Sequence, residues 1–350
     1  MMSRIPIDAL VRPMVRNLKP YASARDEYSG PDGGMVFLDA NENPNDNGLN
    51  RYPDPHSRQV REAMGRFRGV TPDRILLGNG SDEIIDLLFR AFCEPGRDSV
   101  VTLPPSYGMY AVLAGINQVR NLEIPLGPGF QPESEAILEQ AGAQTKLLFL
   151  CTPNNPSGNR FEPARVEALL DGFPGLVVID EAYVDFTPDS GWLPRLSEYP
   201  NLVVTQTFSK ALGMAGIRLG VCFADPGIIA YLNRIKPPYN VNSLTQERAL
   251  AALADPKGIR DQVRVILAER NRMETELAGI PFIRHVFPSD ANFLLVRVDD
   301  AARRYAQLIG KGVVVRNRSG QLNCENTLRL TIGTPAENNH LLAVMREMEA

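Results

Sequence analysis

The sequence lacks the features that would indicate a metal site or a membrane segment. Its three histidines, His56, His285 and His340, are far apart, and no HExxH or comparable ligand spacing occurs. We therefore expect no metal. No apolar run approaches the roughly 20 residues of a membrane span. Charges and prolines interrupt the N-terminal stretch MMSRIPIDALVRPMVRNLKP, unlike the apolar centre of a signal peptide. We therefore expect no membrane contact.

Cysteine is scarce, and the charge is nearly balanced. The four cysteines form no CxxC pair, and they are Cys93, Cys151, Cys222 and Cys324. This pattern is typical of reduced, mostly buried thiols in a cytoplasmic protein. The net charge of −4, with acidic and basic residues well mixed, argues against nucleic-acid binding. It does not exclude small anionic ligands, which need only local cationic groups.

Apolar runs alternate with amphipathic segments through the middle of the chain. The runs RILLG, DSVVTLP, QVRNLEIPL, KLLFLCTP, LVVIDEAY and NLVVTQTFSK predict strands, and most of the segments between them predict helices. Continuous apolar strands separated by helices indicate an α/β fold with a large, mostly parallel sheet that is covered on both faces.

We divide the chain into three parts. Residues 1–50 predict an arm that packs on the small domain or on a partner subunit, with a helical pattern at 7–18 and a strand-like run, MVFLDANENP. Residues 51–255 predict the large α/β domain. Residues 256–350 predict a smaller α+β domain with a long first helix, the strands ANFLLVRV, GVVVRN and TLRLTIG, and a closing helix.

Polar side chains follow three successive apolar strands. Asn155 follows KLLFLCTP, Asp180 and Tyr183 end LVVIDEAY, and Lys210 ends NLVVTQTFSK. Each alone is more often an ordinary loop residue. Because ligands of open α/β sheets bind beyond the carboxyl ends of the strands, the three together predict a site.

The residue types at these ends suit pyridoxal 5'-phosphate. Lys210 can form an imine with an aldehyde and then act as general base and acid. Asp180 can pair with a protonated pyridine nitrogen, and Asn155 and Tyr183 can donate hydrogen bonds to a phenolic oxygen. Taken alone, Lys210 in its glycine-rich loop reads equally well as a surface lysine. The cofactor would supply the chemistry, and the protein would orient it.

A phosphate needs its own binding groups. Gly80, Ser81 and Asp82 stand where a helix is predicted to begin, and backbone N–H groups at a helix N-terminus bind anions. Ser81 or Asp82 would cap that helix in either case. Around the lysine, further candidates for the phosphate are Thr207, Ser209 and Arg218.

Three other residues are candidates for ligand contacts. Tyr107, in PPSYGMY, can stack on a pyridine ring, although a lone tyrosine is more often a packing residue. Arg316 and Arg329 lie on predicted strands of the small domain. Arginine binds carboxylates and phosphates with two parallel hydrogen bonds, but a strand arginine is more often simply solvated.

Together these motifs resemble the histidinol-phosphate aminotransferases, which belong to the aspartate-aminotransferase superfamily of pyridoxal-phosphate enzymes (fold type I). The resemblance runs nearly end to end, through LKPY, LDANENP, RYPDP, GNGSDEIIDLLFRAFCEPG, PPSYGMY, CTPNNPSG, IDEAYVDF, TFSKALGMAGIRLG and LRLTIGTPAEN. It implies the fold of that superfamily, pyridoxal 5'-phosphate on Lys210, and a homodimer whose active sites lie at the interface.

The resemblance also implies roles for individual residues. Tyr52 of RYPDP would reach the cofactor phosphate of the other subunit, and Tyr107 would stack on the ring. The substrate phosphate would meet Tyr21, Arg316 and Arg329, and Arg329 would also bind the carboxylate of glutamate. The implied reaction exchanges an amino group between histidinol phosphate and 2-oxoglutarate.

Three alternatives remain open from the sequence. A threonine-phosphate decarboxylase or an aminotransferase of aromatic amino acids would share the fold and the lysine. A non-catalytic regulator that binds pyridoxal phosphate would be a different class of protein. The complete set of Lys210, Asp180, Tyr183 and Asn155 argues against the regulator.

Overall fold

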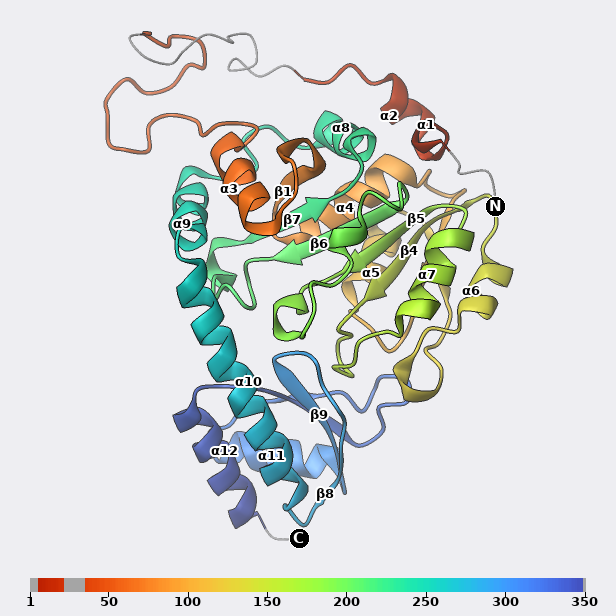
Figure 1. Ribbon diagram of the computed structural model, residues 1–350, viewed down its shortest axis with the longest axis vertical. Coiled ribbons are helices and arrows are strands. Elements are labelled where there is room, and N and C mark those ends of the chain that lie inside the picture. Colours follow the sequence, from red (N-terminus) through yellow and green to blue (C-terminus); the bar gives the residue numbers. More distant parts are fainter. Residues whose placement is uncertain (1–5, 22–34, 349–350) are drawn as a thin grey trace.

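The computed structural model describes residues 6–21 and 35–348 of the chain. It contains a seven-stranded sheet and a four-stranded sheet, and one long helix runs from the first to the second (Figure 1). The N-terminal helices lie beside the large sheet, and the C-terminal helix lies beside the small one.

The large sheet has the strand order β1-β7-β6-β5-β4-β2-β3. Its strands are β1 (Ile75–Asn79), β2 (Ser99–Thr102), β3 (Arg120–Glu123), β4 (Thr145–Cys151), β5 (Leu176–Asp180), β6 (Leu202–Thr207) and β7 (Leu219–Phe223). β7 pairs antiparallel with both of its neighbours, and the pairs among β6, β5, β4, β2 and β3 are parallel. The predicted mostly parallel sheet is therefore confirmed.

Side chains that alternate along each strand build two separate cores. On β4, Leu148 and Leu150 belong to the first core, while Leu147 and Phe149 belong to the second. The first core is covered by α3 (Arg58–Arg68), α6 (Ser134–Gln140), α7 (Pro163–Gly172), α9 (Ser243–Leu253) and the start of α10 (Pro256–Ala278). The second is covered by α4 (Ser81–Phe92), α5 (Met109–Ile116) and α8 (Pro226–Ile235). Burial on both faces explains why these strands read as continuous apolar runs.

The small sheet has the order β10-β11-β9-β8, and all its pairs are antiparallel. Its strands are β8 (Ile283–Val286), β9 (Phe293–Val298), β10 (Arg316–Asn317) and β11 (Thr327–Thr331). α11 (Ala301–Gly310) and α12 (Pro335–Glu347) complete this unit. Val263 of α10 packs in the first core of the large sheet, whereas Met273 and Leu277 pack in the core of the small sheet. α10 therefore joins the two units.

Short 3-10 helices occur in the connections. They are η2 (Pro72–Arg74), η3 (Pro128–Phe130), η4 (Val184–Phe186), η5 (Leu193–Arg195) and η6 (Ala215–Ile217). The four cysteines are free and buried, as the sequence predicted.

The N-terminal arm differs from its prediction in two respects. The helix expected over 7–18 is split into α1 (Ile7–Leu10) and α2 (Pro13–Asn17), because Pro13 disfavours the helical conformation at the residue before it. Both helices pack on α8, where the Tyr231 hydroxyl donates a hydrogen bond of 2.8 Å to Asp8. The strand expected in MVFLDANENP is absent: residues 35–44 carry no strand, and Val36 is 82% exposed.

Four elements of the structure were not predicted from the sequence, and one predicted strand is shorter than expected. The unpredicted elements are β7, α8 and α9, which lie between residues 211 and 255, and β8, which follows α10. β7 was missed because glycines interrupt its apolar run, and β8 was missed because it contains the polar residues Arg284 and His285. The strand expected for GVVVRN contains only Arg316–Asn317.

Candidate active site

The polar ends of β4, β5 and β6 lie side by side, as the sequence predicted. In the sheet register Cys151 is opposite Asp180, and Asp180 is opposite Thr205. The three strands therefore end together, and the loops that follow them carry Asn155, Tyr183 and Lys210 to one edge of the sheet.

Lys210 projects from the loop after β6; part of its side chain is exposed to solvent within this site, and the rest is covered by its neighbours. Its ammonium Nζ lies 5.7 Å from the centre of the Tyr183 ring. Partial burial lowers the pKa of Lys210, and the positive charge of Arg329 lowers it further, while Asp180 acts in the opposite direction. A lowered pKa favours the neutral amine, which is the nucleophilic form.

Asp180 is a buried carboxyl group with no cation paired to it among the described residues. It accepts a hydrogen bond of 2.7 Å from the Tyr110 hydroxyl and one of 3.1 Å from the Ala182 amide. Burial raises the pKa of Asp180, and these two hydrogen bonds oppose that rise. A cation placed against the carboxylate would be strongly stabilised, because the site supplies hydrogen bonds but no opposite charge.

The sequence reading missed Tyr110. It lies on α5, is 1% exposed, and stacks on Phe149 with ring centres 4.7 Å apart. The available signal was the spacing of Tyr107 and Tyr110: Tyr107 lies just before α5, and its ring meets that of Tyr110 edge-on with ring centres 5.5 Å apart.

Asn155 and Tyr183 lie near Arg329, which is on β11 of the small sheet. Arg329 donates a hydrogen bond of 2.5 Å from Nη1 to Asn155 Oδ1. Tyr183 packs edge-on against Phe293 with ring centres 5.2 Å apart. Burial raises the pKa of Tyr183, so its hydroxyl remains protonated and able to donate a hydrogen bond. The neighbouring Asn154 is instead fully buried and holds the loop by bonds to Pro105 and Ser157.

Backbone groups of Gly80 and Ser81 and the guanidinium group of Arg218 lie close together at the start of α4. Gly80 has φ of +80°, and a Cβ there would lie 2.7 Å from Arg218 Nη2. Gly220 is the partner of Thr207 in the sheet, and a Cβ on it would lie 2.4 Å from the Ser81 amide nitrogen. Only glycine therefore allows the close approach of Arg218, the Ser81 amide and the end of β6.

The predicted capping by Ser81 or Asp82 is wrong. Gly80 is the N-cap residue, and no side chain caps the helix. Asp82 instead accepts a hydrogen bond of 3.0 Å from the Tyr107 hydroxyl and lies 3.8 Å from Arg218. The first amides of α4 are therefore left without a side-chain cap, as an anion site requires. Ser209 is tied to the same region, because its amide donates a hydrogen bond to the Thr207 hydroxyl at 3.1 Å.

Among the described residues, four arginines share one face of the small sheet, because Arg297 on β9 is the sheet partner of Thr327 and lies on the same side as Arg316, Arg318 and Arg329. Arg316 is paired with Arg329, and Arg318 follows two residues later, so the side chains of Arg316 and Arg318 lie on the side of Arg329. Burial lowers the pKa of Arg318, and the charges of Arg329 and Arg316 lower it further. The sequence reading missed Arg318, although the period of two residues along a strand could have found it.

Tyr21 and Tyr52 stand apart from this group. Their side chains are 75% and 53% exposed, and Tyr52 stacks on Tyr239 with ring centres 4.6 Å apart. Within residues 6–21 and 35–348, no hydrogen bond or ring contact joins either tyrosine to Lys210 of the same chain.

The fold and this donor set together define a pyridoxal-phosphate-dependent enzyme. Comparison with known proteins narrows the class: residues 27–345 match the class I and II aminotransferases, and the chain belongs to that family. A histidinol-phosphate aminotransferase of Christiangramia forsetii is 57% identical over 98% of this chain and 98% of its own. One from Flavobacterium johnsoniae is 54% identical over 96% of this chain and 97% of its own.

A solved structure supports the same assignment of fold and cofactor. The histidinol-phosphate aminotransferase of Sinorhizobium meliloti, solved with pyridoxal-5'-phosphate, is 26% identical and superimposes with a TM-score of 0.77. The match covers 85% of this chain and 82% of that one.

The residues present here fit this cofactor. The buried carboxylate of Asp180 lacks a cation, which a protonated pyridine nitrogen supplies, and the uncapped amides of α4 beside Arg218 suit its phosphate. Lys210, with its lowered pKa, suits the aldehyde.

Proposed function

We propose that this protein is a histidinol-phosphate aminotransferase, which exchanges an amino group between histidinol phosphate and 2-oxoglutarate. The products would be imidazole-acetol phosphate and glutamate, in the synthesis of histidine. The observation that carries the proposal is the arginine face of β10 and β11, which is joined to the site by the bond from Arg329 to Asn155. A phosphate-bearing amine needs such a cationic surface close to the reacting amino group.

The residues divide into those that handle the proton and those that hold charge. When bound, pyridoxal phosphate supplies an electron sink for the carbon that loses its proton. Lys210 would take that proton and return it at the other carbon as general base and acid. Asp180, held by Tyr110, would keep the pyridine nitrogen protonated. Tyr183 and Asn155 would donate hydrogen bonds to the ring oxygen.

The anionic groups would be held at two places. Gly80, Ser81, Thr207, Ser209 and Arg218 would bind the cofactor phosphate, with Tyr107 against the ring and Asp82 fixing Tyr107 and Arg218. At the other end of the site, the substrate phosphate would meet Arg316 and Arg329, and Arg329 would also receive the carboxylate of glutamate. Tyr21 would join that phosphate site.

The protein would act as a homodimer in which Tyr52 reaches the cofactor phosphate of the partner subunit. Exposed apolar side chains before Tyr52 support this assembly, since large apolar patches mark interaction surfaces; they are Met35, Val36, Leu38 and Leu49. Mixing tests the shared site. Inactive Lys210→Ala and weakened Tyr52→Ala homodimers, exchanged in solution, should regain activity, because a mixed dimer contains one intact site. No recovery after proven exchange would contradict a shared site.

The remaining parts of the proposal concern layout and location. Residues 51–255 would form the cofactor-binding domain, residues 256–350 the small domain that closes on the substrate, and residues 1–50 the arm. Of that arm, residues 1–5 and 22–34 lie outside the described residues. The free, buried cysteines support a cytoplasmic location. In the described part of the chain, no helix is long and apolar enough to cross a membrane.

A half-reaction tests the function. Histidinol phosphate alone is added to the purified, cofactor-loaded protein, and the visible absorbance of the cofactor is followed. We expect a rapid change that 2-oxoglutarate reverses. A response to phenylalanine only, or carbon dioxide release from threonine phosphate, would keep the fold and Lys210 but replace the substrate.

A further inference from the structure

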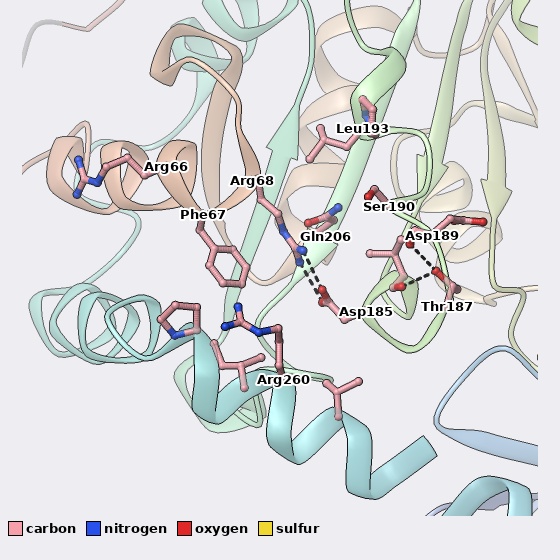
Figure 2. Close-up of a pocket in the computed structure, with 15 residues that line it drawn as sticks. Arg66, Phe67, Arg68, Asp185, Thr187, Asp189, Ser190, Leu193, Gln206 and Arg260 are labelled. Carbon is pink, nitrogen blue, oxygen red and sulfur yellow. Dashed lines mark hydrogen bonds and ion pairs between the residues drawn. The ribbon is translucent and has the colours of Figure 1, made fainter. Parts of the chain in front are cut away.

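Arginines near the strand ends differ in how their charge is matched. Along β5 and β6 the side chains alternate, so Asp180 and Thr207 point toward the α4 side of the large sheet, while Gln206 points toward the α3 side. On the α3 side, Arg68 donates hydrogen bonds of 2.8 and 3.0 Å to Asp185 (Figure 2). The charge of that arginine is therefore neutralised within the chain.

The arginines on the face of the small sheet have no acidic partner. Within residues 6–21 and 35–348 none of them forms an ion pair, and they are Arg297, Arg316, Arg318 and Arg329. Like charges on one face repel each other, and an anion bound among them relieves that repulsion. The proposed function uses only Arg316 and Arg329.

Arg318 is open to a ligand, whereas Arg297 is engaged elsewhere. Arg297 lies over the Phe287 ring at 5.4 Å and donates a hydrogen bond of 3.4 Å to the Asn323 carbonyl. The guanidinium of Arg318 makes no hydrogen bond or ring contact with the described residues. Its Nε is enclosed, but its terminal Nη1 and Nη2 are accessible.

Arg318 also lies close to the other two arginines of the site. Its amide donates a hydrogen bond of 2.9 Å to the Thr327 carbonyl, so the pairing of Arg316 with Arg329 continues to Arg318. Burial lowers the pKa of Arg318, the charges of Arg329 and Arg316 lower it further, and Tyr183 acts in the opposite direction. The guanidinium is therefore within electrostatic range of the active site.

Arg329 by itself has few donors left for a phosphate. Its Nη1 donates to Asn155 and its Nε is enclosed, so only Nη2 remains open with respect to the described residues. A phosphate ester presents three oxygens and a charge of about −1.5 to −2 at pH 7, whereas a carboxylate presents two oxygens and one charge. A phosphate therefore needs donors from more than one arginine, and its double charge suits a cluster of cations.

We propose that Arg318 determines the preference of this site for a phosphate ester. Its terminal nitrogens would bind phosphate oxygens that Arg316 and Arg329 leave open. They would have no partner when the carboxylate of glutamate occupies Arg329. This role rests on the proposed function, in which one pocket receives both anions.

Two half-reactions of the cofactor-loaded protein test the role of Arg318, one with histidinol phosphate and one with glutamate. Arg318→Gln should lower kcat/KM for histidinol phosphate about 10- to 100-fold, mostly through KM, because hydrogen bonds to a charged group are lost. The value for glutamate should stay within about threefold. Arg318→Lys should restore part of the loss, because it keeps the charge. Arg284→Gln removes the same charge from the exposed side of β8 and is the matched control.

The pH dependence separates phosphate binding from a structural role. The second pKa of a phosphate ester is about 6, so the substrate phosphate loses its second charge as the pH falls below that value. The loss caused by Arg318→Gln should therefore shrink between about pH 7.5 and about pH 5.5. An equal loss with both substrates at every pH, no loss, or a loss that appears in Arg297→Gln instead would overturn the role while the proposed function stands.

A binding measurement covers the case in which histidinol phosphate is not a substrate and the proposed function fails. Propyl phosphate and butyrate carry no amino group and cannot react, so calorimetric titration of the loaded protein compares the two anions directly. Tighter binding of propyl phosphate that Arg318→Gln removes would support Arg318 as the selector of phosphate. No preference for propyl phosphate, or a preference unchanged in Arg318→Gln, would overturn it.

Discussion

The two faces of the strand-end edge treat charge in opposite ways. On the α4 face, Asp180 is buried without a cation among the described residues. Lys210 in the same site, and Arg329 and Arg318 of the small sheet, all have lowered pKa values, chiefly because burial disfavours their charged forms. On the α3 face, Arg68 and Asp185 form a closed two-bond pair. The first site is completed by an ionic cofactor and substrate. On the second face Arg68 and Asp185 neutralise each other within the chain, and the buried carboxyl group of Glu181 is instead favoured in its protonated form, because burial raises its pKa.

This difference predicts which property each face controls. Changes on the α4 face should reduce activity and leave stability unchanged or slightly raised, since a buried charge without a partner opposes folding. Changes on the α3 face should reduce stability and leave turnover almost unchanged. Four substitutions test this contrast, from the largest expected effect to the smallest.

Lys210→Ala should have the largest effect. We expect the rate of the half-reaction to fall by at least about a thousandfold, because general acid–base catalysis by a positioned side chain contributes ~10²–10⁴. The thermal midpoint should move little. Stopped-flow absorbance gives the rate, and Lys257→Ala, an exposed lysine that pairs with Asp261, is the control. A normal rate in Lys210→Ala would remove the lysine from the mechanism.

Arg329→Lys should come second. It keeps the charge but loses the forked geometry and the bond to Asn155. The loss of a charge-assisted hydrogen bond predicts a decrease in kcat/KM for histidinol phosphate of about 10- to 100-fold. Most of it should appear in KM. Arg284→Lys, on the exposed side of β8, should behave as the unaltered protein. A fall in kcat alone would place Arg329 outside phosphate binding.

Glu181→Gln should change the pH dependence of stability. Burial raises the pKa of Glu181 from 4.5 to about 7, against hydrogen bonds from the Trp192 amide and Gln206. A raised folded pKa means that the native state holds a proton that the unfolded chain releases. Stability should therefore fall as pH rises from about 4.5 to about 7, by about 3 kcal/mol from this group.

In Glu181→Gln that contribution to the slope should vanish, while Glu162→Gln, on the surface, should keep it. Denaturant unfolding of the loaded protein at several pH values measures the slope. The slope is the test, because the amide also changes the hydrogen bonds at Trp192 and Gln206. An unchanged slope would mean that Glu181 is ionised throughout this range.

What the sequence could predict follows from how local each feature is. Asn155, Asp180, Tyr183 and Lys210 each end an apolar run, and parallel strands must end together, so their meeting was predictable. Tyr110 and Arg318 had only weak local signals in their spacing to Tyr107 and Arg316, and they were missed because what makes them site residues is contact with Asp180 and Arg329, which are distant in sequence. The strand expected in residues 35–44 failed for a related reason: an apolar run forms a strand only beside another strand, and this chain places none there among its described residues.

Asp185→Asn should have the smallest effect. The introduced amide would keep one acceptor for Arg68 but lose the charge, and the side chains of Asp185 and Arg68 are 20% and 17% exposed. The exposure of this ion pair is intermediate between that of surface pairs and that of fully buried pairs. We therefore expect a loss of about 1 kcal/mol in the free energy of unfolding. Turnover should stay within about twofold, because no step uses this pair. Asp261→Asn, in an exposed pair on α10, should cost less. If Asp185→Asn instead reduced turnover strongly at unchanged stability, the two faces would not be separable, and the α3 face would belong to the catalytic machinery.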